Sequence, residues 1–319
     1  MITVLTGGTG GAKFVDGLRR IVSPKELTVI VNTGDDHEWW GLYVSPDLDS
    51  ITYMMAGILS PERGWGVRGD TFHCLQTMKE LGEPSWFSVG DRDLAIHLLR
   101  TKLLSQGCSL SEATQTIAEK LRVHTCILPM SDHKIETRVQ TPLGELSFEE
   151  YFVKRRYQDP VSAVRFAGAA DSNPAPGVVE AITNADAVLI APSNPITSIG
   201  PILAVLGIRE ALRETAAKVV AVSPILGTAA VSGPAAALMA SQGFETTIAG
   251  IVDCYADFID GLIVDDADTD SAQRLIGRGV QIESTNIFMR TTEDRIRIAR
   301  TALTLAMPEL ATAKMVEAS

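Results

Sequence analysis

The chain begins with a short apolar stretch that runs directly into a glycine cluster, Ile2-Thr-Val-Leu-Thr6-Gly7-Gly8-Thr9-Gly10-Gly11-Ala12-Lys13. Glycine has no Cβ atom, so the backbone of such a loop can approach a phosphate closely. A helix that starts there points its first free N–H groups, and the positive end of its dipole, at the same place. The stretch therefore predicts a nucleotide or phosphate cradle built by Gly7, Gly8, Thr9, Gly10, Gly11 and Lys13. A plain strand–helix turn is the alternative.

Neither of two common phosphate-binding motifs is matched completely. The dinucleotide fingerprint needs its third glycine where Lys13 stands, and the P-loop needs a glycine where Ala12 stands. The cradle alone therefore does not identify the ligand, and other segments have to decide.

Composition limits the function classes. The chain has 319 residues, 45% of them apolar, which is enough for one large α/β core or two modest ones. A net charge of −11 argues against a nucleic-acid partner. The four cysteines are widely spaced, so neither a zinc site nor a disulfide framework is indicated. No apolar run reaches about 18 residues, and no signal peptide is recognised, so a cytoplasmic protein is expected.

Short apolar runs alternate with helical patterns, which is typical of a doubly wound, mostly parallel α/β sheet of the Rossmann-like class. Expected strands are Ile2–Thr6, Leu27–Asn32, Ala187–Ala191, Val219–Ser223 and Ile248–Asp253. The middle of the chain differs, with helices expected at Thr71–Leu81, Leu94–Ser105 and Leu110–Leu121 and a hairpin or loop at Gly144–Lys154. We therefore expect a nucleotide-binding core from residues 1–60 and 165–319, and a mainly helical inserted subdomain from residues 61–164.

Polar loops follow several of the expected strands, at the edge where parallel sheets bind ligands. These loops are Asn32-Thr-Gly-Asp-Asp36, Pro192-Ser-Asn-Pro-Ile-Thr-Ser-Ile-Gly-Pro201 and Ser223-Pro-Ile. They offer hydroxyls, amides and N–H groups rather than positive charge. Together with the glycine loop, they predict a nucleotide site to which Asn32, Ser193, Asn194, Ser198 and Ser223 contribute. Any one of the loops, taken alone, is more often a simple turn, and it is their occurrence at successive strand ends that favours a ligand site.

The segment Ser45-Pro-Asp-Leu-Asp49 places two carboxylates two residues apart at the start of a helical pattern. Asp47 and Asp49 either cap that helix or share a divalent cation such as Mg²⁺, which prefers oxygen ligands. Asp36 and Asp70 are further candidate ligands. Arg92, in Gly90-Asp-Arg-Asp93, can meet an anion or pair with its neighbours.

Histidine and tryptophan carry weaker signals. His97 lies on the helix expected after Asp93. The other histidines, His37, His73, His124 and His133, have no mutual metal-ligand spacing and are read as structural or surface residues. Trp39, Trp40 and Trp65 can stack on a flat ring, but tryptophan also belongs to cores.

The ordered motifs resemble those of one known family, the 2-phospho-L-lactate transferases of coenzyme F420 biosynthesis. The resemblance runs from about residue 2 to residue 265, and its most specific segments are Ser45-Pro-Asp-Leu-Asp49 and Pro192-Ser-Asn-Pro-Ile-Thr-Ser-Ile-Gly-Pro201. Further matches are Gly7-Gly-Thr-Gly10, Asn32-Thr-Gly-Asp-Asp36, Gly69-Asp-Thr-Phe72, Gly90-Asp-Arg-Asp93, Leu128-Pro-Met-Ser-Asp132 and Ser223-Pro-Ile. Members often have Gly-Thr-Pro-Lys where this chain has Gly10-Gly11-Ala12-Lys13, which keeps Lys13 in register.

The resemblance implies a Mg²⁺-dependent transfer from a guanylylated donor. The donor carries phospholactate or a close analogue, linked to GMP through a diphosphate, and the acceptor is the deazaflavin Fo, whose terminal hydroxyl displaces GMP. Asp47 and Asp49 are then the catalytic carboxylates. Asp47, Asp49, Asp36 and Asp70 are the candidate Mg²⁺ ligands, and Asp49 and Arg92 are the expected Fo contacts. The family precedent also implies a homodimer.

Two other hypotheses remain at this point. A related group of proteins shares the glycine loop and the Pro-Ser-Asn-Pro loop, and resembles a nucleotide-sugar-binding regulator without transferase activity. An NAD(P) dehydrogenase is disfavoured for two reasons. The glycine fingerprint is broken, and Asp35 and Asp36 lie a few residues too late to be the ribose-binding acid. The phospho-acid of the donor is not indicated by any residue.

Overall fold

The computed structural model describes residues 1–275 and 277–309. A seven-stranded parallel sheet forms its centre, in the order β14-β13-β10-β9-β1-β2-β5. The strands are β1 (Ile2–Thr6), β2 (Leu27–Val31), β5 (Cys126–Pro129), β9 (Ala187–Ile190), β10 (Lys218–Val222), β13 (Gly261–Val264) and β14 (Gln281–Ser284). The predicted doubly wound α/β class is confirmed.

Helices cover both faces of this sheet, and each face has its own hydrophobic core. The strands are apolar on both faces, as expected for a parallel sheet that is covered on both sides. One core packs against α6 (Val178–Thr183), α7 (Ile199–Ala204), α8 (Ile208–Glu214), α9 (Ala235–Ser241) and α10 (Ile248–Cys254). The other packs against α1 (Gly8–Leu18), α2 (Pro46–Met55), α5 (Leu110–Lys120) and α12 (Thr292–Ala306).

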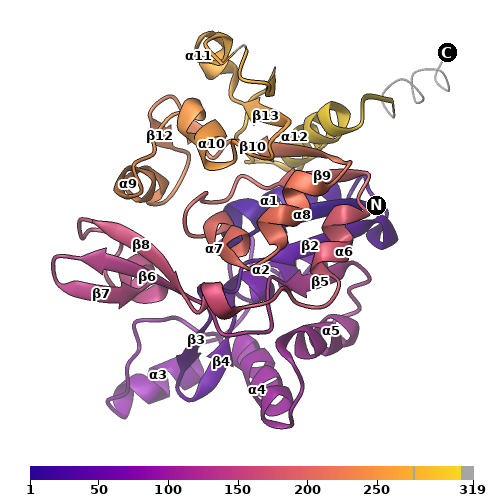
Figure 1. Cartoon of the computed structure of the whole chain (residues 1–319). Coiled ribbons are helices and arrows are strands. Elements are labelled where there is room, and N and C mark those ends of the chain that lie inside the picture. The colour runs from indigo at the N-terminus through magenta and orange to yellow at the C-terminus, as the bar shows by residue number, and fades with distance from the viewer. Residues whose placement is uncertain (276, 310–319) are drawn as a thin grey trace.

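Smaller elements surround the edge of the sheet where the strands end (Figure 1). A three-stranded antiparallel sheet, at the left of the view, contains β6 (Glu136–Thr141), β7 (Gly144–Ser147) and β8 (Ala163–Ala167). The hairpin β3 (His37–Trp39) and β4 (Leu42–Val44) lies below it with α3 (His73–Glu80) and α4 (Asp91–Ser105). Further elements are the hairpin β11 (Ile225–Leu226) and β12 (Ala229–Ala230), the helix α11 (Thr269–Gln273) and a π-helical turn at Glu150–Lys154. Short 3-10 turns lie at Pro24–Glu26, Ala169–Asp171 and Asp266–Asp268.

Two expectations need correction. The run Ile248–Asp253 is not a strand but the helix α10, and its N-cap Thr247 accepts a hydrogen bond from the Gly250 N–H at 3.3 Å. A short apolar run fits either element, and here the cap decides for the helix. The segment 61–164 is not simply a helical insertion, because it contributes β5 to the central sheet and contains β6 and β7.

The three helices expected between residues 71 and 121 are present as α3, α4 and α5, although α4 starts three residues earlier than expected. Among the described residues, no helix is long and apolar enough to cross a membrane.

Candidate active site

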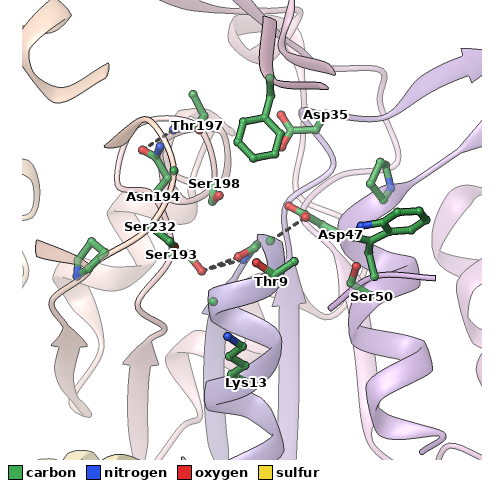
Figure 2. Close-up of a pocket in the computed structure, with 18 of the residues that line it drawn as sticks. Thr9, Lys13, Asp35, Asp47, Ser50, Ser193, Asn194, Thr197, Ser198 and Ser232 are labelled. Carbon is green, nitrogen blue, oxygen red and sulfur yellow. Dashed lines mark hydrogen bonds between the residues drawn. The ribbon is translucent and has the colours of Figure 1, made fainter. Parts of the chain in front are cut away.

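A cavity of about 660 Å³ lies at the carboxyl-terminal edge of the central sheet (Figure 2). Its wall combines the loops that follow β1, β9 and β10 with the first turns of α2 and α4, the π-helical turn after β7 and the loop before α12. Of the predicted site residues, eleven line it: Gly7, Gly8, Thr9, Gly10, Lys13, Asp47, Asp49, Ser193, Asn194, Ser198 and Ser223. The structure therefore brings together residues that are up to about two hundred positions apart in the chain.

The glycine loop is held by side chains from distant segments. The Gly8 N–H donates to Asp47 Oδ1 at 2.7 Å, and the Gly7 N–H donates to Ser193 Oγ at 3.2 Å (Figure 2). The first N–H groups of a helix have no partner within the helix. Asp47, which belongs to α2, therefore caps the N-terminus of α1. It does not cap its own helix, whose N-cap is Ser45. The N–H groups of Thr9 and Gly10 remain at the mouth of the cradle for an anion.

The glycines serve different purposes. Gly8 has φ +67°, and nothing lies within 3.4 Å of the place where its Cβ would be, so its role is the turn itself. A Cβ at Gly10 would lie 2.8 Å from the Pro192 carbonyl oxygen, and one at Gly11 would overlap Thr6 Oγ1. Gly10 and Gly11 therefore allow α1 to pack closely against its neighbours, and Gly11 does not reach the cavity wall.

Asn32 is fully buried behind the wall and organises it. Its Nδ2 group donates to Asp35 Oδ2 at 2.9 Å and to Asp47 Oδ2 at 3.0 Å. Its Oδ1 accepts from the Gly34 N–H at 2.8 Å. The predicted nucleotide-site residue Asn32 is thus a support for two carboxylates and is not itself exposed to the cavity.

Besides Gly11 and Asn32, three predicted residues lie away from the cavity wall. Asp70 accepts hydrogen bonds from the backbone N–H groups of Arg92 and Asp93, so it caps α4. Arg92 is exposed, and its guanidinium donates to the Arg68 carbonyl. Asp36 accepts from Tyr43 and Ser45 behind the wall. Asp70 thus holds the start of α4, whereas the Arg92 guanidinium bonds the loop that precedes α3. The expected roles of Asp70 in metal binding and of Arg92 in acceptor binding stay predictions.

Three buried carboxylates, Asp35, Asp47 and Glu149, form what we call the uncompensated carboxylates. Each is at most 7% exposed, and each lines the cavity. No basic side chain forms an ion pair with any of them within the described part of the chain, and Asp35 Oδ1 has no hydrogen-bond partner. Unpaired buried charge is costly, so this group is suited to a cation with oxygen ligands.

Their pKa values reflect the missing positive charge. Burial, together with the charges of Asp47 and Asp36, raises the pKa of Glu149 to about 8. Burial also raises the pKa of Asp47 to about 6 and that of Asp35 well above its ordinary value, with the Asp47 charge adding to the effect on Asp35. Burial and nearby carboxylates both disfavour the charged form.

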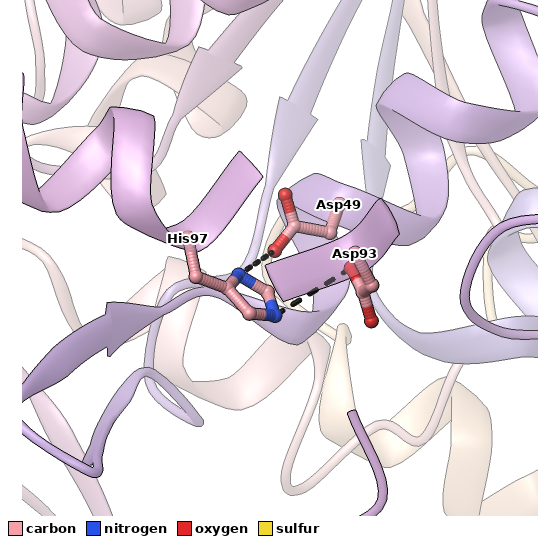
Figure 3. A group of neighbouring side chains, drawn as sticks. All are labelled: Asp49, Asp93 and His97. Atoms are coloured by element: carbon pink, nitrogen blue, oxygen red, sulfur yellow. Dashed lines mark ion pairs between the residues drawn. The ribbon is translucent and has the colours of Figure 1, made fainter. Parts of the chain in front are cut away.

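A second group of polar side chains, the α2–α4 seam, consists of Asp49, Tyr53, Asp93, His97 and Arg100. Here the carboxylates have partners: the Arg100 guanidinium pairs with both oxygens of Asp49, and Tyr53 donates to Asp93 Oδ1 at 2.6 Å. The His97 ring lies between Asp49 and Asp93, with a nitrogen 3.5 Å from each (Figure 3). His97, for which the sequence indicated only a place on the helix after Asp93, lines the cavity.

The aromatic residues divide differently from the expectation. Trp65 lines the cavity and is available to a flat ring. Trp39 is 6% exposed and packs against Trp86, with ring centroids 4.8 Å apart. Trp40 donates its indole N–H to the Pro84 carbonyl outside the wall. Trp39 and Trp40 thus belong to a small aromatic core, whereas Phe87, Phe148 and Phe152 line the cavity and were missed.

The fold and this cavity define a Rossmann-like α/β protein with an anion cradle that faces buried carboxylates. A family model described as "2-phospho-L-lactate transferase CofD" matches residues 2–300. The chain belongs to this family, and it is a transferase by membership.

Several curated relatives support the assignment. The chain is 43% identical to a 2-phospho-L-lactate transferase of Methanococcoides burtonii, over 91% of this chain and 94% of the relative. It is 42% identical to a phosphoenolpyruvate transferase of Streptomyces coelicolor, over 96% of this chain and 98% of the relative. A 2-phospho-L-lactate transferase of Methanocaldococcus jannaschii is 40% identical over 94% of this chain and 96% of its own length.

A solved structure confirms the fold. A UPF0052 family protein from Bacillus halodurans superposes with a TM-score of 0.64 over 95% of this chain and 98% of that chain, at 18% identity. At this identity, the likeness concerns the fold alone.

The raised pKa of Glu149 predicts a pH dependence of stability. An acid whose pKa is raised on folding stabilises the protein below its unfolded value, here about 4.5, and that contribution is lost as pH rises through about 8. We expect the thermal midpoint of metal-free protein to fall between about pH 5 and about pH 8, and Glu149→Gln to make this decrease smaller. Glu150→Gln, which changes an acid paired with Lys154, is the matched control. Equal pH profiles for Glu149→Gln and the wild type would contradict the assignment.

Proposed function

We propose that this chain transfers a phosphorylated three-carbon acid from a GMP-linked diphosphate donor to the terminal hydroxyl of the deazaflavin Fo, as a step in coenzyme F420 biosynthesis. The acid is 2-phospho-L-lactate, or the related phosphoenolpyruvate or phosphoglycerate. The observation that carries the proposal is the cavity in which the anion cradle of α1 faces three uncompensated carboxylates, in a chain of the CofD family.

In the proposed reaction, the oxygen of the acceptor hydroxyl attacks the phosphorus that carries the three-carbon acid. A new P–O bond forms to the acceptor, the bond from that phosphorus to the bridging oxygen breaks, and GMP leaves with the electron pair. The hydroxyl gives its proton to solvent water as the new bond forms. Such transfers depend on positioning and on charge stabilisation more than on covalent help from the protein.

The phosphates of the donor fit the cradle at α1. The N–H groups of Thr9 and Gly10, with Ser198 and Asn194 opposite, offer donors without fixed positive charge. Lys13 is exposed on the same helix and lines the cavity, where its ammonium can reach a phosphate.

The guanosine fits the end of the cavity near β14, which is the edge of the strand order away from Asp47. The loop between β14 and α12 brings Phe288 and Arg290 to the wall, with the Arg290 guanidinium 4.8 Å from the centroid of the Phe288 ring. A guanidinium can read O6 and N7 of guanine with two hydrogen bonds, and Phe288 offers a ring to the base.

A substitution tests the guanosine placement. Arg290→Ala should weaken GDP binding and remove most of the preference for GDP over ADP, since a two-hydrogen-bond contact discriminates between bases by about 1–3 kcal/mol. Arg300→Ala, at an exposed position of α12, should leave both affinities unchanged. Calorimetric titration of both nucleotides measures the effect. An unaltered GDP preference in Arg290→Ala would place the base elsewhere.

The uncompensated carboxylates suit a Mg²⁺ ion better than the ligands predicted from the sequence, which were Asp36, Asp47, Asp49 and Asp70. Asp47 is retained from that set, and Asp35 and Glu149 join it because they are buried, lack a basic partner and face the cavity. Asp49 is already paired with Arg100, while Asp36 and Asp70 are engaged by other donors. When bound, Mg²⁺ would neutralise the diphosphate and polarise the reacting phosphorus.

The metal assignment predicts a specific loss. Asp47→Asn should fold, but it should bind Mg²⁺ weakly and lose most turnover, because asparagine keeps the shape and loses the charge. Calorimetric titration with Mg²⁺ and initial rates give independent measurements. Asp270→Asn, at an exposed position in α11, serves as the control. Full activity in excess EDTA, or wild-type Mg²⁺ affinity in Asp47→Asn, would contradict the assignment.

The activity itself is tested with three donors. Purified protein is incubated with Fo, Mg²⁺ and the guanylylated form of phospholactate, phosphoenolpyruvate or phosphoglycerate, and the products are identified by mass spectrometry. Relatives named for phospholactate and for phosphoenolpyruvate are almost equally similar to this chain, so identity does not select the donor. We expect Fo to gain one phospho-acid group, with equimolar GMP. Folded protein that binds GDP but gives no product with any donor would refute the proposal.

The homodimer stays a prediction.

A further inference from the structure

Helix α4 buries charge where an ordinary surface helix buries leucine. Its buried residues are Asp93, His97 and Arg100, spaced four and three residues apart so that they share one face. Leu98, in contrast, is 52% exposed. Helices normally bury an apolar stripe, and buried ions bring a large desolvation cost. The inward face of α4 therefore calls for an explanation other than packing.

This face meets two polar residues of α2. Asp49 and Tyr53 lie one turn apart on α2, and both point to α4. Arg100 Nη1 donates to Asp49 Oδ2 at 3.0 Å, and Arg100 Nη2 donates to Asp49 Oδ1. The two parallel hydrogen bonds fix the plane of the carboxylate as well as its position.

Arg100 does not touch the cavity. Asp49, Tyr53, Asp93 and His97 all line it, whereas Arg100 lies behind them and is 2% exposed. Any effect of Arg100 on a bound molecule must therefore pass through Asp49 or His97. A carboxylate has about four lone-pair sites, so two hydrogen bonds from Arg100 leave others for a group in the cavity.

The geometry also argues against a metal ion in the seam. One ligand atom from each of Asp49, Asp93 and His97 lies within 4.8 Å of the others, a spacing that a metal could use. However, the Arg100 guanidinium already provides positive charge to Asp49 and lies 3.5 Å from His97 Nδ1. In contrast to Asp35, Asp47 and Glu149, the seam has its counter-charge within the protein.

We propose that Arg100 is a positioning residue that locks the Asp49 carboxylate so that it accepts a hydrogen bond from the attacking hydroxyl of the acceptor. This inference rests on the proposed function. Asp49 is then an orienting acceptor, held at a fixed distance from the donor phosphates in the α1 cradle. A displacement of about 1 Å in such a group can reduce a rate by about a hundredfold.

The test compares Arg100→Ala, Asp49→Asn and the double variant under single-turnover conditions, at saturating donor and Fo. We expect Arg100→Ala to reduce the rate constant by roughly 10²-fold, with GDP affinity within about twofold of the wild type. In the Asp49→Asn background, Arg100→Ala should cause little further loss, because residues that act as a unit are not additive. Losses that multiply, or a shared loss of GDP affinity, would show a merely structural role.

Chemical rescue provides a second readout that stability alone does not affect. Millimolar methylguanidinium should restore part of the rate of Arg100→Ala and none of the rate of the double variant. If Arg100→Ala does not fold, Arg100→Lys takes its place: it keeps the charge and loses the two-pronged contact, so a rate reduced at least tenfold with normal GDP affinity is expected. Wild-type rates in Arg100→Lys would overturn the inference. An inactive wild type would instead refute the proposed function.

Discussion

One buried amide links the parts of this site. The Asn32 Nδ2 group, at the end of β2, donates to Asp35 in its own loop, to Asp47 in α2 and, at 3.4 Å, to the Thr197 carbonyl after β9. Asp47 in turn caps α1 through the Gly8 N–H. The loops of three neighbouring strands and the start of α2 thus share one hydrogen-bond network. Because a buried group left unpaired costs about 1–3 kcal/mol, the network favours a single arrangement of the cradle.

The cavity contains two acidic groups with opposite electrostatics. In the α2–α4 seam, Arg100 compensates Asp49, and Tyr53 donates to Asp93. Burial opposes ionisation of Asp93, but hydrogen bonds from His97 and Tyr53 still lower its pKa. Asp47 and Glu149 form no ion pair with a basic side chain among the described residues, and burial raises the pKa of both. In the proposed mechanism, similar residue types would therefore have different tasks: the seam would orient the acceptor hydroxyl, and the uncompensated carboxylates would hold a cation.

Local patterns were predictable from the sequence, and long-range partners were not. The β1–glycine–α1 unit follows from adjacent residues, as do α3 and α5, so these predictions are confirmed. Asp35 could have been predicted as a site residue, because it lies in the same loop as Asp36. Glu149 lies immediately before the π-helical turn Glu150–Lys154, which no pattern in the sequence indicates. Arg100 could have been suspected from the Asp93, His97, Arg100 spacing, yet its partner Asp49 is 51 residues away. The roles of Asp70 and Arg92 stay predictions, and the sequence motif did not indicate that Asp70 caps α4.

The charge of the cavity constrains how the proposed donor can bind. Five acidic side chains line the wall, Asp35, Asp47, Asp49, Asp93 and Glu149, against two basic ones, Lys13 and Arg290, in a chain of net charge −11. A diphosphate ester with a carboxylate is itself strongly anionic, so the uncompensated carboxylates and the donor repel each other in a partly dry cavity. Helix dipoles supply only about half a charge, which does not balance this excess. A divalent cation between Asp47 and the diphosphate would turn the repulsion into attraction on both sides. An acid-rich wall is therefore compatible with an anionic substrate because the cation would bridge the two.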